Sequence, residues 1–252
     1  MNYGKTIELS IILPSLGEGV CLEGMLKLLT IDIEMPYEIV FACDIGELDH
    51  ALKERVDRKY PMVKWLEKTR NECTLETLKR GVQAADGQYI LVLCADTAGP
   101  DLPIANMMNL IKADCDFVST TRYAGGGQRL GGAFFEVMLS RSANYILHHF
   151  AGSVFTDCTT GLKLFRKNVF GQLSLQAKSS GWVTAFEMAL KAQTAGLKLG
   201  EVATISVDRL YGGSSTCELG SEFLEYIKWF IWGLTMLHNA PTKHLFMPIK
   251  QI

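Results

Sequence analysis

The chain has 252 residues, of which 48% are hydrophobic and 21% are charged, and its formal net charge is -2. This length and mixture favour one folded α/β domain over residues 1–252, and the nearly balanced charge argues against DNA or RNA as a partner. The seven cysteines are scattered, odd in number and without a CxxC pair, which favours reduced thiols and argues against a structural zinc site.

The first half of the chain alternates short apolar runs with patterns of helical spacing. Strands are expected at residues 7–13, 37–42, 63–67 and 89–94, and helices at residues 21–29, 51–59 and 74–85. The run at 89–94 is apolar throughout, which indicates a strand buried on both faces in the middle of a parallel sheet.

The same alternation continues in the second half. Helices are expected at residues 102–113, 134–150 and 183–194, and strands at residues 117–121, 162–165 and 198–207. An amphipathic helix at about 221–237 ends this series. Its aromatic residues at helical spacing favour a place in the core over contact with a membrane.

This order of elements implies a mostly parallel, doubly wound central sheet flanked by helices. Ligands of such sheets bind at the carboxyl ends of the strands. The residues expected there include three carboxylates and one guanidinium, and they are Pro14, Glu18, Asp44, Asp96 and Arg122. Their clustering predicts a binding site at this edge.

A series of short motifs follows one order along the chain: LPSLGE, the turn at Asp44, CAD, TTRY, SRSAN, DCTTGLKLF, GEV and VDRLYGGS. The series resembles family 2 glycosyltransferases, and within them the polyprenyl-phosphate sugar synthases of the dolichyl-phosphate mannose synthase type, over roughly residues 7 to 237. The resemblance implies the GT-A fold. It also implies an inverting transfer of a hexose from a nucleotide-diphosphate sugar, of the GDP-mannose or UDP-glucose type, to a polyprenyl phosphate.

The resemblance assigns the donor nucleotide to the first strands. Pro14, Glu18 and Asp44 match positions that hold the base and ribose, where carboxylates accept hydrogen bonds from neutral groups. Ser214, in the VDRLYGGS motif, matches a donor-binding serine. The alternative interpretation makes Glu18 a helix N-terminal charge and Asp44 a strand-end cap.

Asp96 matches the last acid of the family's DxD motif, where Mg²⁺ or Mn²⁺ neutralises the donor diphosphate. Cys94 stands where that motif has its first acid, and a thiol is a poor ligand for Mg²⁺. Asp96 is therefore the expected metal ligand and one of the expected catalytic residues. The alternative is a turn residue at the end of a strand.

The other catalytic residues that the resemblance implies are arginines. Arg122, Arg141 and Arg209 match positions near the donor diphosphate and the acceptor phosphate, where a guanidinium can bind anionic oxygens in a bidentate manner. Arg122 and Arg141 are assigned to the acceptor together with Asp157 and Thr160, which shape its loop. A polyprenyl phosphate is already an oxyanion, so positioning replaces a general base. A surface ion pair is the alternative for each arginine.

Parts of the sequence also bear on other functions. A dinucleotide-binding oxidoreductase is disfavoured because Leu22 stands where the Rossmann fingerprint needs its third glycine. A degenerate member that binds a nucleotide sugar without catalysis remains open because of Cys94. A GT-A transferase with a saccharide acceptor also remains open, with Glu187 as its candidate base.

The sequence shows neither a signal-peptide pattern nor an apolar run of the roughly 20 residues that span a membrane. We therefore expect a cytoplasmic protein. A lipid acceptor would make it peripheral at the inner face of a membrane.

Overall fold

The computed structural model describes residues 6–14, 22–30, 33–43, 45–46, 49–69, 72–93, 102–178, 181–208, 221–240 and 244–248. The strands within them are β1 (Leu9–Leu13), β2 (Tyr37–Cys43), β3 (Val63–Glu67), β4 (Tyr89–Leu93), β5 (Phe117–Thr121), β6 (Gln128–Leu130), β7 (Leu162–Arg166), β8 (Leu199–Ala203), β9 (Ile205–Val207) and β10 (His244–Met247). The helices are α1 (Leu22–Leu29), α2 (His50–Lys59), α3 (Thr74–Ala84), α4 (Ile104–Lys112), α5 (Phe134–Phe150), α6 (Gly181–Thr194) and α7 (Ser221–Met236), with 3-10 helices η2 (Lys167–Leu173) and η3 (Leu237–Asn239).

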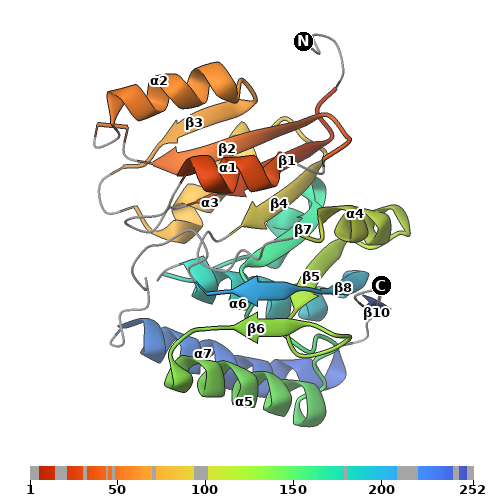
Figure 1. Ribbon diagram of the computed structural model, residues 1–252. Coiled ribbons are helices and arrows are strands. Elements are labelled where there is room, and N and C mark those ends of the chain that lie inside the picture. Colours follow the sequence, from red (N-terminus) through yellow and green to blue (C-terminus); the bar gives the residue numbers. More distant parts are fainter. Residues whose placement is uncertain are drawn as a thin grey trace.

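Eight of these strands form one sheet in the order β10-β8-β5-β7-β4-β1-β2-β3 (Figure 1). Neighbouring strands are parallel except at β7, which runs antiparallel to both β4 and β5. The strands β6 and β9 pair separately in a parallel ribbon. The predicted mostly parallel sheet with flanking helices is confirmed.

Both faces of the sheet are covered, because side chains alternate along each strand. On one face, Ile12, Val92 and Phe117 pack with residues of α3, α5, α6 and α7. On the other face, Ile11 and Leu91 pack with residues of α1, α2 and α4. The strand β4 is buried on both sides, as its continuous apolar run predicts.

The C-terminal part differs from the expected pattern in two places. The strand predicted at 198–207 is divided at Thr204 into β8 and β9, which belong to different sheets. The strands β6 and β10 were not predicted, since three or four residues are too short to establish a period.

The amphipathic helix predicted at about 221–237 is α7, which packs beside α5 and α6 (Figure 1). Trp229 of this helix is 1% exposed, so the predicted place of its aromatic residues in the core is confirmed for this side chain. Among the described helices, none combines the length and apolar character that crossing a membrane requires.

Candidate active site

The carboxyl ends of β2, β1, β4 and β5 lie at one edge of the sheet, and the antiparallel β7 begins at that edge. Pro14 is buried directly after β1, and Arg122 follows β5. The loop that carries Asp157 and Thr160 leads into β7. The fold therefore brings these four predicted residues to the edge where the sequence places the site.

The other predicted donor residues lie outside the described residues. They are Glu18, Asp44, Asp96, Arg209 and Ser214, together with Cys94 of the altered DxD motif. Their roles stay predictions.

A buried ion pair between Arg122 and Asp157 forms the centre of the described site. Arg122 Nε donates to Asp157 Oδ2 at 2.7 Å, and Nη2 donates to Oδ1 at 3.0 Å. The side chain of Asp157 is fully buried and that of Arg122 is 5% exposed. Two of the three guanidinium nitrogens thus bind within the protein, in the bidentate geometry predicted for a phosphate.

The charges of this pair stabilise each other away from water. Burial alone would raise the pKa of the Asp157 carboxyl, but the charge and hydrogen bonds of Arg122 hold that pKa below its usual value. Burial acts against the charge of Arg122 as well, and Asp157 nevertheless raises its pKa. Both side chains are therefore ionised at neutral pH.

Helix α5 closes one side of this pair with residues of the SRSAN motif. Asn144 Nδ2 donates to Asp157 Oδ1 at 3.1 Å, while Asn144 Oδ1 accepts a hydrogen bond from the Cys158 amide at 2.8 Å. The Ser140 hydroxyl lies 2.9 Å from that of Thr159 and accepts a hydrogen bond from Arg122 Nη2 at 3.3 Å. The TTRY, SRSAN and DCTTG motifs therefore meet in one hydrogen-bonded cluster.

Glu201 of β8 binds the loop that carries Asp157. Its Oε1 accepts hydrogen bonds from the amides of Thr156 and Asp157 at 2.9 and 3.1 Å, and its Oε2 accepts one from the Thr156 hydroxyl. Burial raises the pKa of this carboxyl to about 8, although the Thr156 hydrogen bond opposes the shift. Glu201 positions the backbone that carries Asp157.

Lys163 of β7 holds the end of the same loop. Its Nζ donates to Ser119 Oγ at 2.7 Å, to Thr160 Oγ1 at 3.1 Å and to the Cys158 carbonyl at 3.2 Å. Burial lowers the pKa of this amine to about 8. Thr160 is thereby tied to β5 and β7. Its role in shaping an acceptor loop stays a prediction.

A small hollow opens beside this cluster. Its polar lining comes from Thr120, Arg122, Thr160, Thr204 and Ser206. The Thr120 hydroxyl oxygen is buried and has no hydrogen-bond partner among the described residues. The hollow has room for about one water molecule, so it is too small to hold a phosphate or a sugar by itself.

Arg141 stands apart from the other predicted acceptor residues. It follows Ser140 on α5, and successive helical residues point about 100° apart. Its side chain is exposed, and it has no hydrogen bond or ion pair with another described residue. The described structure therefore does not bring Arg141 together with Arg122.

Glu187, the candidate base for a saccharide acceptor, is fully buried in α6. Its two oxygens accept hydrogen bonds from the amides of Gln176 and Ala177, both at 2.7 Å, and Lys191 lies 2.7 Å away as an ion pair. These contacts fasten the segment before α6. They do not suit a base that must reach a substrate hydroxyl.

Asn144, Lys163 and Glu201 were not assigned roles from the sequence. Lys163 and Glu201 could have been noticed, because each is a charged residue inside a short apolar strand, LKLFR for Lys163 and LGEVA for Glu201. A charge at such a position requires partners when the strand is buried. The signal for Asn144 was its place at the end of the SRSAN motif.

In the described part of the chain, no group of three or more His, Cys, Asp or Glu side chains is arranged to hold a metal ion. The predicted ligand Asp96 lies outside that part. The metal site therefore stays a prediction.

Comparison with known proteins links the chain to sugar transfer. The family model described as glycosyl transferase family 2 matches residues 10–174. Dolichol-phosphate mannosyltransferase of Pyrococcus furiosus is 26% identical over 139 residues, which make up 54% of this chain and 39% of that protein. The aligned region thus spans well under half of the relative's length.

Solved structures share the fold. Glucosyl-3-phosphoglycerate synthase from Mycobacterium tuberculosis in complex with phosphoglyceric acid has a TM-score of 0.64 at 12% identity, covering 91% of this chain and 81% of that one. The same enzyme with Mn²⁺ and UDP-glucose has a TM-score of 0.63 at 14% identity, covering 91% and 80%. At this identity the likeness shows the fold, and the predicted GT-A arrangement is confirmed.

Proposed function

Because the chain belongs to glycosyl transferase family 2, we propose that it moves a hexose from a nucleotide-diphosphate sugar to a polyprenyl phosphate, with inversion at the anomeric carbon. Its class as a glycosyltransferase that uses a nucleotide sugar follows from the family. The lipid acceptor is the finer part of the proposal. It is supported by the motif series and by the Pyrococcus furiosus relative, whose name includes dolichol phosphate.

The observation that carries the proposal is the cluster around Arg122 and Asp157. Residues from three motifs, up to 37 positions apart in the chain, meet there at the carboxyl edge of the sheet. In α/β sheets this edge is where ligands bind. A cluster assembled from the motifs typical of polyprenyl-phosphate sugar synthases favours an acceptor of that class.

The chemistry requires little from the protein beyond placement and charge. An oxygen of the acceptor phosphate attacks the anomeric carbon, a new carbon–oxygen bond forms, and the bond to the donor diphosphate breaks, so that the nucleotide diphosphate leaves. The acceptor is already ionised, so no proton has to be removed from it. Arg122 screens the developing charge from a fixed position. Arg141, which the described structure leaves apart from Arg122, is assigned a contact with the acceptor as it approaches, and Arg209 a contact with the diphosphate.

We assign Mg²⁺ or Mn²⁺ to Asp96 and the donor diphosphate. Mg²⁺ commonly binds through one or two carboxylates with waters and phosphate oxygens, so the substitution at Cys94 leaves a workable ligand set. When bound, the ion would neutralise charge on the departing nucleotide. The mycobacterial enzyme of the same fold was crystallised with Mn²⁺ and UDP-glucose.

The test is a transfer assay with purified protein, Mn²⁺ or Mg²⁺, a polyprenyl phosphate in detergent and labelled GDP-mannose or UDP-glucose. Label should enter the organic phase. Arg141→Ala should abolish that signal, whereas Arg58→Ala, which removes an exposed arginine of α2, should leave it unchanged.

Other results would contradict the proposal in distinguishable ways. Transfer to an added saccharide or to 3-phosphoglycerate, with none to the lipid, would identify a soluble acceptor. Donor binding in calorimetry without transfer to any acceptor would identify the degenerate, non-catalytic member.

A further inference from the structure

The exposed apolar side chains of this protein are concentrated in its C-terminal half. Among the described residues, every large hydrophobic side chain classed as exposed lies at Leu130 or later. Six belong to α5: Phe134, Phe135, Met138, Tyr145, Ile146 and Phe150. Three belong to α7: Leu224, Ile231 and Met236. We call these nine side chains the α5–α7 face.

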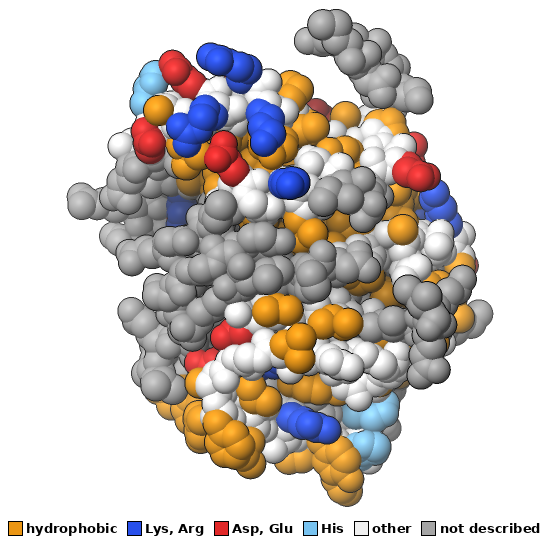
Figure 2. All heavy atoms as spheres, viewed as in Figure 1, with side chains coloured by type: hydrophobic (Ala, Val, Ile, Leu, Met, Phe, Trp, Pro, Cys, Tyr) orange, Lys and Arg blue, Asp and Glu red, His pale blue; other side chains and the backbone are white. Residues whose placement is uncertain are grey.

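The exposure is large enough to require an explanation. Phe134 is 79% exposed, Phe150 is 65% exposed and Leu224 is 71% exposed. Single exposed apolar residues are ordinary, but contiguous apolar surface marks a contact with a partner or a membrane. Figure 2 shows hydrophobic side chains gathered at the lower end of the molecule, where Figure 1 places α5.

Helix α5 has two faces with opposite roles. Phe134, Met138 and Tyr145 lie four and seven positions apart in turn, which places them on one side of a helix. The other side carries Ala143, Asn144 and Leu147 into the protein. The outward side, which a helix in water would cover with charged residues, is apolar here.

The fully exposed charges on these two helices have one sign. Among the residues of α5 and α7 classed as exposed, Arg141 and Lys228 are the charged ones, and neither Asp nor Glu occurs. Helix α2 shows the usual alternative, because its exposed residues include Glu54, Arg55 and Asp57. The α5–α7 face therefore combines apolar and aromatic side chains with exposed positive charge, while the half-buried carboxylates Glu136 and Glu225 contact Arg129 and the Lys178 amide.

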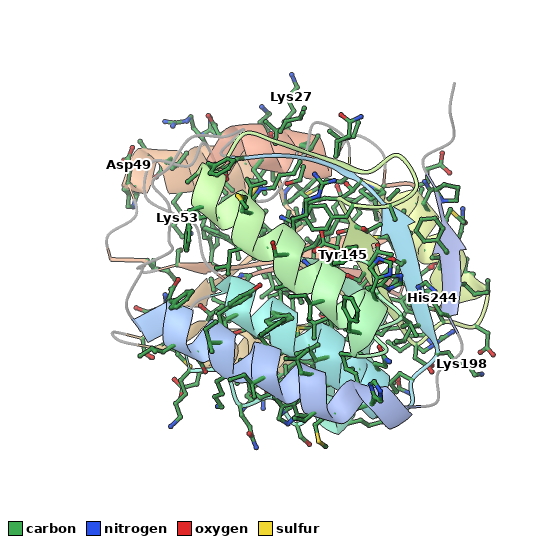
Figure 3. All side chains as sticks on the ribbon, turned by 90° about the horizontal axis from the view of Figure 1, so that it is seen from below. Lys27, Asp49, Lys53, Tyr145, Lys198 and His244 are labelled. Atoms are coloured by element: carbon green, nitrogen blue, oxygen red, sulfur yellow. The ribbon has the colours of Figure 1, made fainter. Side chains whose placement is uncertain are left out.

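Both helices lie on the same side of the molecule. Seen from below, α5 and α7 lie side by side in front of the sheet, with Tyr145 on α5 (Figure 3). Figure 1 shows the same two helices adjacent at the lower end. One flat surface can therefore contact both.

We propose that the α5–α7 face docks this protein onto the surface of an anionic lipid bilayer. Apolar side chains on an interfacial helix enter the boundary between headgroups and acyl chains, while Lys and Arg attract anionic headgroups. A second copy of the chain fits less well. It would bury Arg141 and Lys228 in an apolar interface, where the half-buried carboxylates of these helices, Glu136 and Glu225, already contact Arg129 and the Lys178 amide.

Docking in this way would bring lipid phosphates close to the acceptor cluster, a consequence that rests on the proposed function. Ser140 and Asn144 reach Arg122 and Asp157 from the inward side of α5. A helix is about 10 Å across, so the cluster would lie about one helix diameter from the membrane surface. A lipid-borne phosphate could then reach the site while its chain stays in the bilayer.

The docking itself is tested without donor or acceptor, by sedimenting the full chain with vesicles. Wild type should bind vesicles of equal parts phosphatidylcholine and phosphatidylglycerol. Met138→Glu with Leu224→Glu should weaken binding by at least about tenfold. The matched control, Ala51→Glu with Ala84→Glu, adds the same charge at exposed positions of α2 and α3 and should bind as wild type does. Lys228→Gln should weaken binding about fivefold on anionic vesicles.

Three results would overturn the proposal. In the first, the wild type does not bind anionic vesicles; in the second, the Met138/Leu224 variant binds them as well as the control variant does. In the third, the wild type sediments as a dimer and the Met138/Leu224 variant as a monomer. Thermal melts of all variants show that each is folded. Transfer to a short, water-soluble prenyl phosphate separates the two proposals, since the Met138/Leu224 variant should retain it, and its absence in wild type would count against the proposed function alone.

Discussion

Arg122 and Asp157 are candidate site residues that also stabilise the loop before β7. Their ion pair is buried, bidentate and surrounded by hydroxyl groups of Ser140 and Thr159. A buried ion pair stabilises a fold little more than apolar residues of the same shape would. Removal of one partner is costly, however, because the other charge stays buried without a counter-charge. The pair therefore maintains the geometry of the acceptor loop as well as the charge within it.

Asp157→Asn should lower the free energy of unfolding by about 3–5 kcal/mol, because Arg122 would stay buried without its counter-charge. Urea denaturation measures the change. The control is Asp114→Asn, which breaks an exposed pair with Lys198 and should cost less than about 1 kcal/mol. Equal effects of the two substitutions would show that the buried pair has no special role.

Glu201 predicts a dependence of stability on pH. Its pKa is about 8 in the folded protein, against an ordinary value of 4.5. The folded protein therefore keeps a proton that the unfolded chain releases between these values. Glu201 therefore makes its full contribution to the free energy of unfolding below pH 4.5. That contribution decreases as pH rises from 4.5 to about 8, by up to about 1.4 kcal/mol per pH unit.

Glu201→Gln should remove this decrease. The amide oxygen can still accept hydrogen bonds from the two loop amides, as Oε1 of the carboxyl does, and the amide has no charge at any of these pH values. The stability of the variant relative to wild type should therefore rise between about pH 5 and 8, as measured by urea denaturation at several pH values. Glu54→Gln, at an exposed site, should show no such trend; a constant difference between Glu201→Gln and wild type would refute the assignment.

At the scale of elements, the C-terminal strand β10 packs against the loop that follows Arg122. It pairs with β8 at the edge of the sheet. Gly125 has a φ of +59°, and a Cβ placed there would lie 2.5 Å from Phe246 Cζ and 3.0 Å from Pro248 Cα. His244, labelled in Figure 3, packs its ring against Phe155 of the acceptor loop with centroids 6.0 Å apart.

Gly125→Ala should displace β10, because the new methyl group meets both a ring and backbone. The positive φ adds about 1 kcal/mol and the overpacking adds about 1–3 kcal/mol. Hydrogen exchange of the amides in β10 should become faster than in wild type. Gly171→Ala is the matched control, since nothing lies within 4 Å of its added Cβ. Unchanged exchange in β10 would show that the contact does not hold the strand.

Helix α5 connects the two proposals at this scale. Its inward side supplies Ser140 and Asn144 to the acceptor cluster, and its outward side forms most of the α5–α7 face. If α5 docks on a membrane as proposed, the same helix would fix the distance between the membrane surface and the loop that precedes β7.

For the whole molecule, the sheet separates two regions of different character. Charged side chains gather at the upper end over α2, and hydrophobic side chains gather at the lower end over α5 (Figure 2). The acceptor cluster lies on the side of the sheet covered by α5 and α7. This arrangement suits the proposed transfer from a soluble donor to a membrane-bound acceptor.

Much of this architecture was predictable from the sequence. The alternation of period-two and period-3.6 patterns located α5 at its observed bounds and β5 likewise, because these periods arise from neighbouring residues along the chain. The antiparallel direction of β7 was not predictable, since its run of apolar residues is the same in either direction.

The sequence predicted which residues meet at the site, but not how their side chains pair there. Arg122, Asp157 and Thr160 lie together, as their motifs predicted, but the guanidinium of Arg122 binds Asp157 rather than remaining free at all three nitrogens. Glu201 and Lys163 complete the cluster from β8 and β7, and pairs such as Lys163 with Ser119 join residues 44 positions apart. Such partners depend on the order of strands in the sheet.

By itself, the sequence determined the order of helices and strands, the family, and the motifs that carry the chemistry, because each of these depends on residues close together in the chain. The tertiary structure decided which charges are paired and which apolar side chains remain exposed. Trp229 of α7 is buried, while Phe134 and Tyr145 of α5 lie outside, although both helices are rich in aromatic residues. Burial depends on which elements pack against each other, and that packing is a property of the folded chain as a whole.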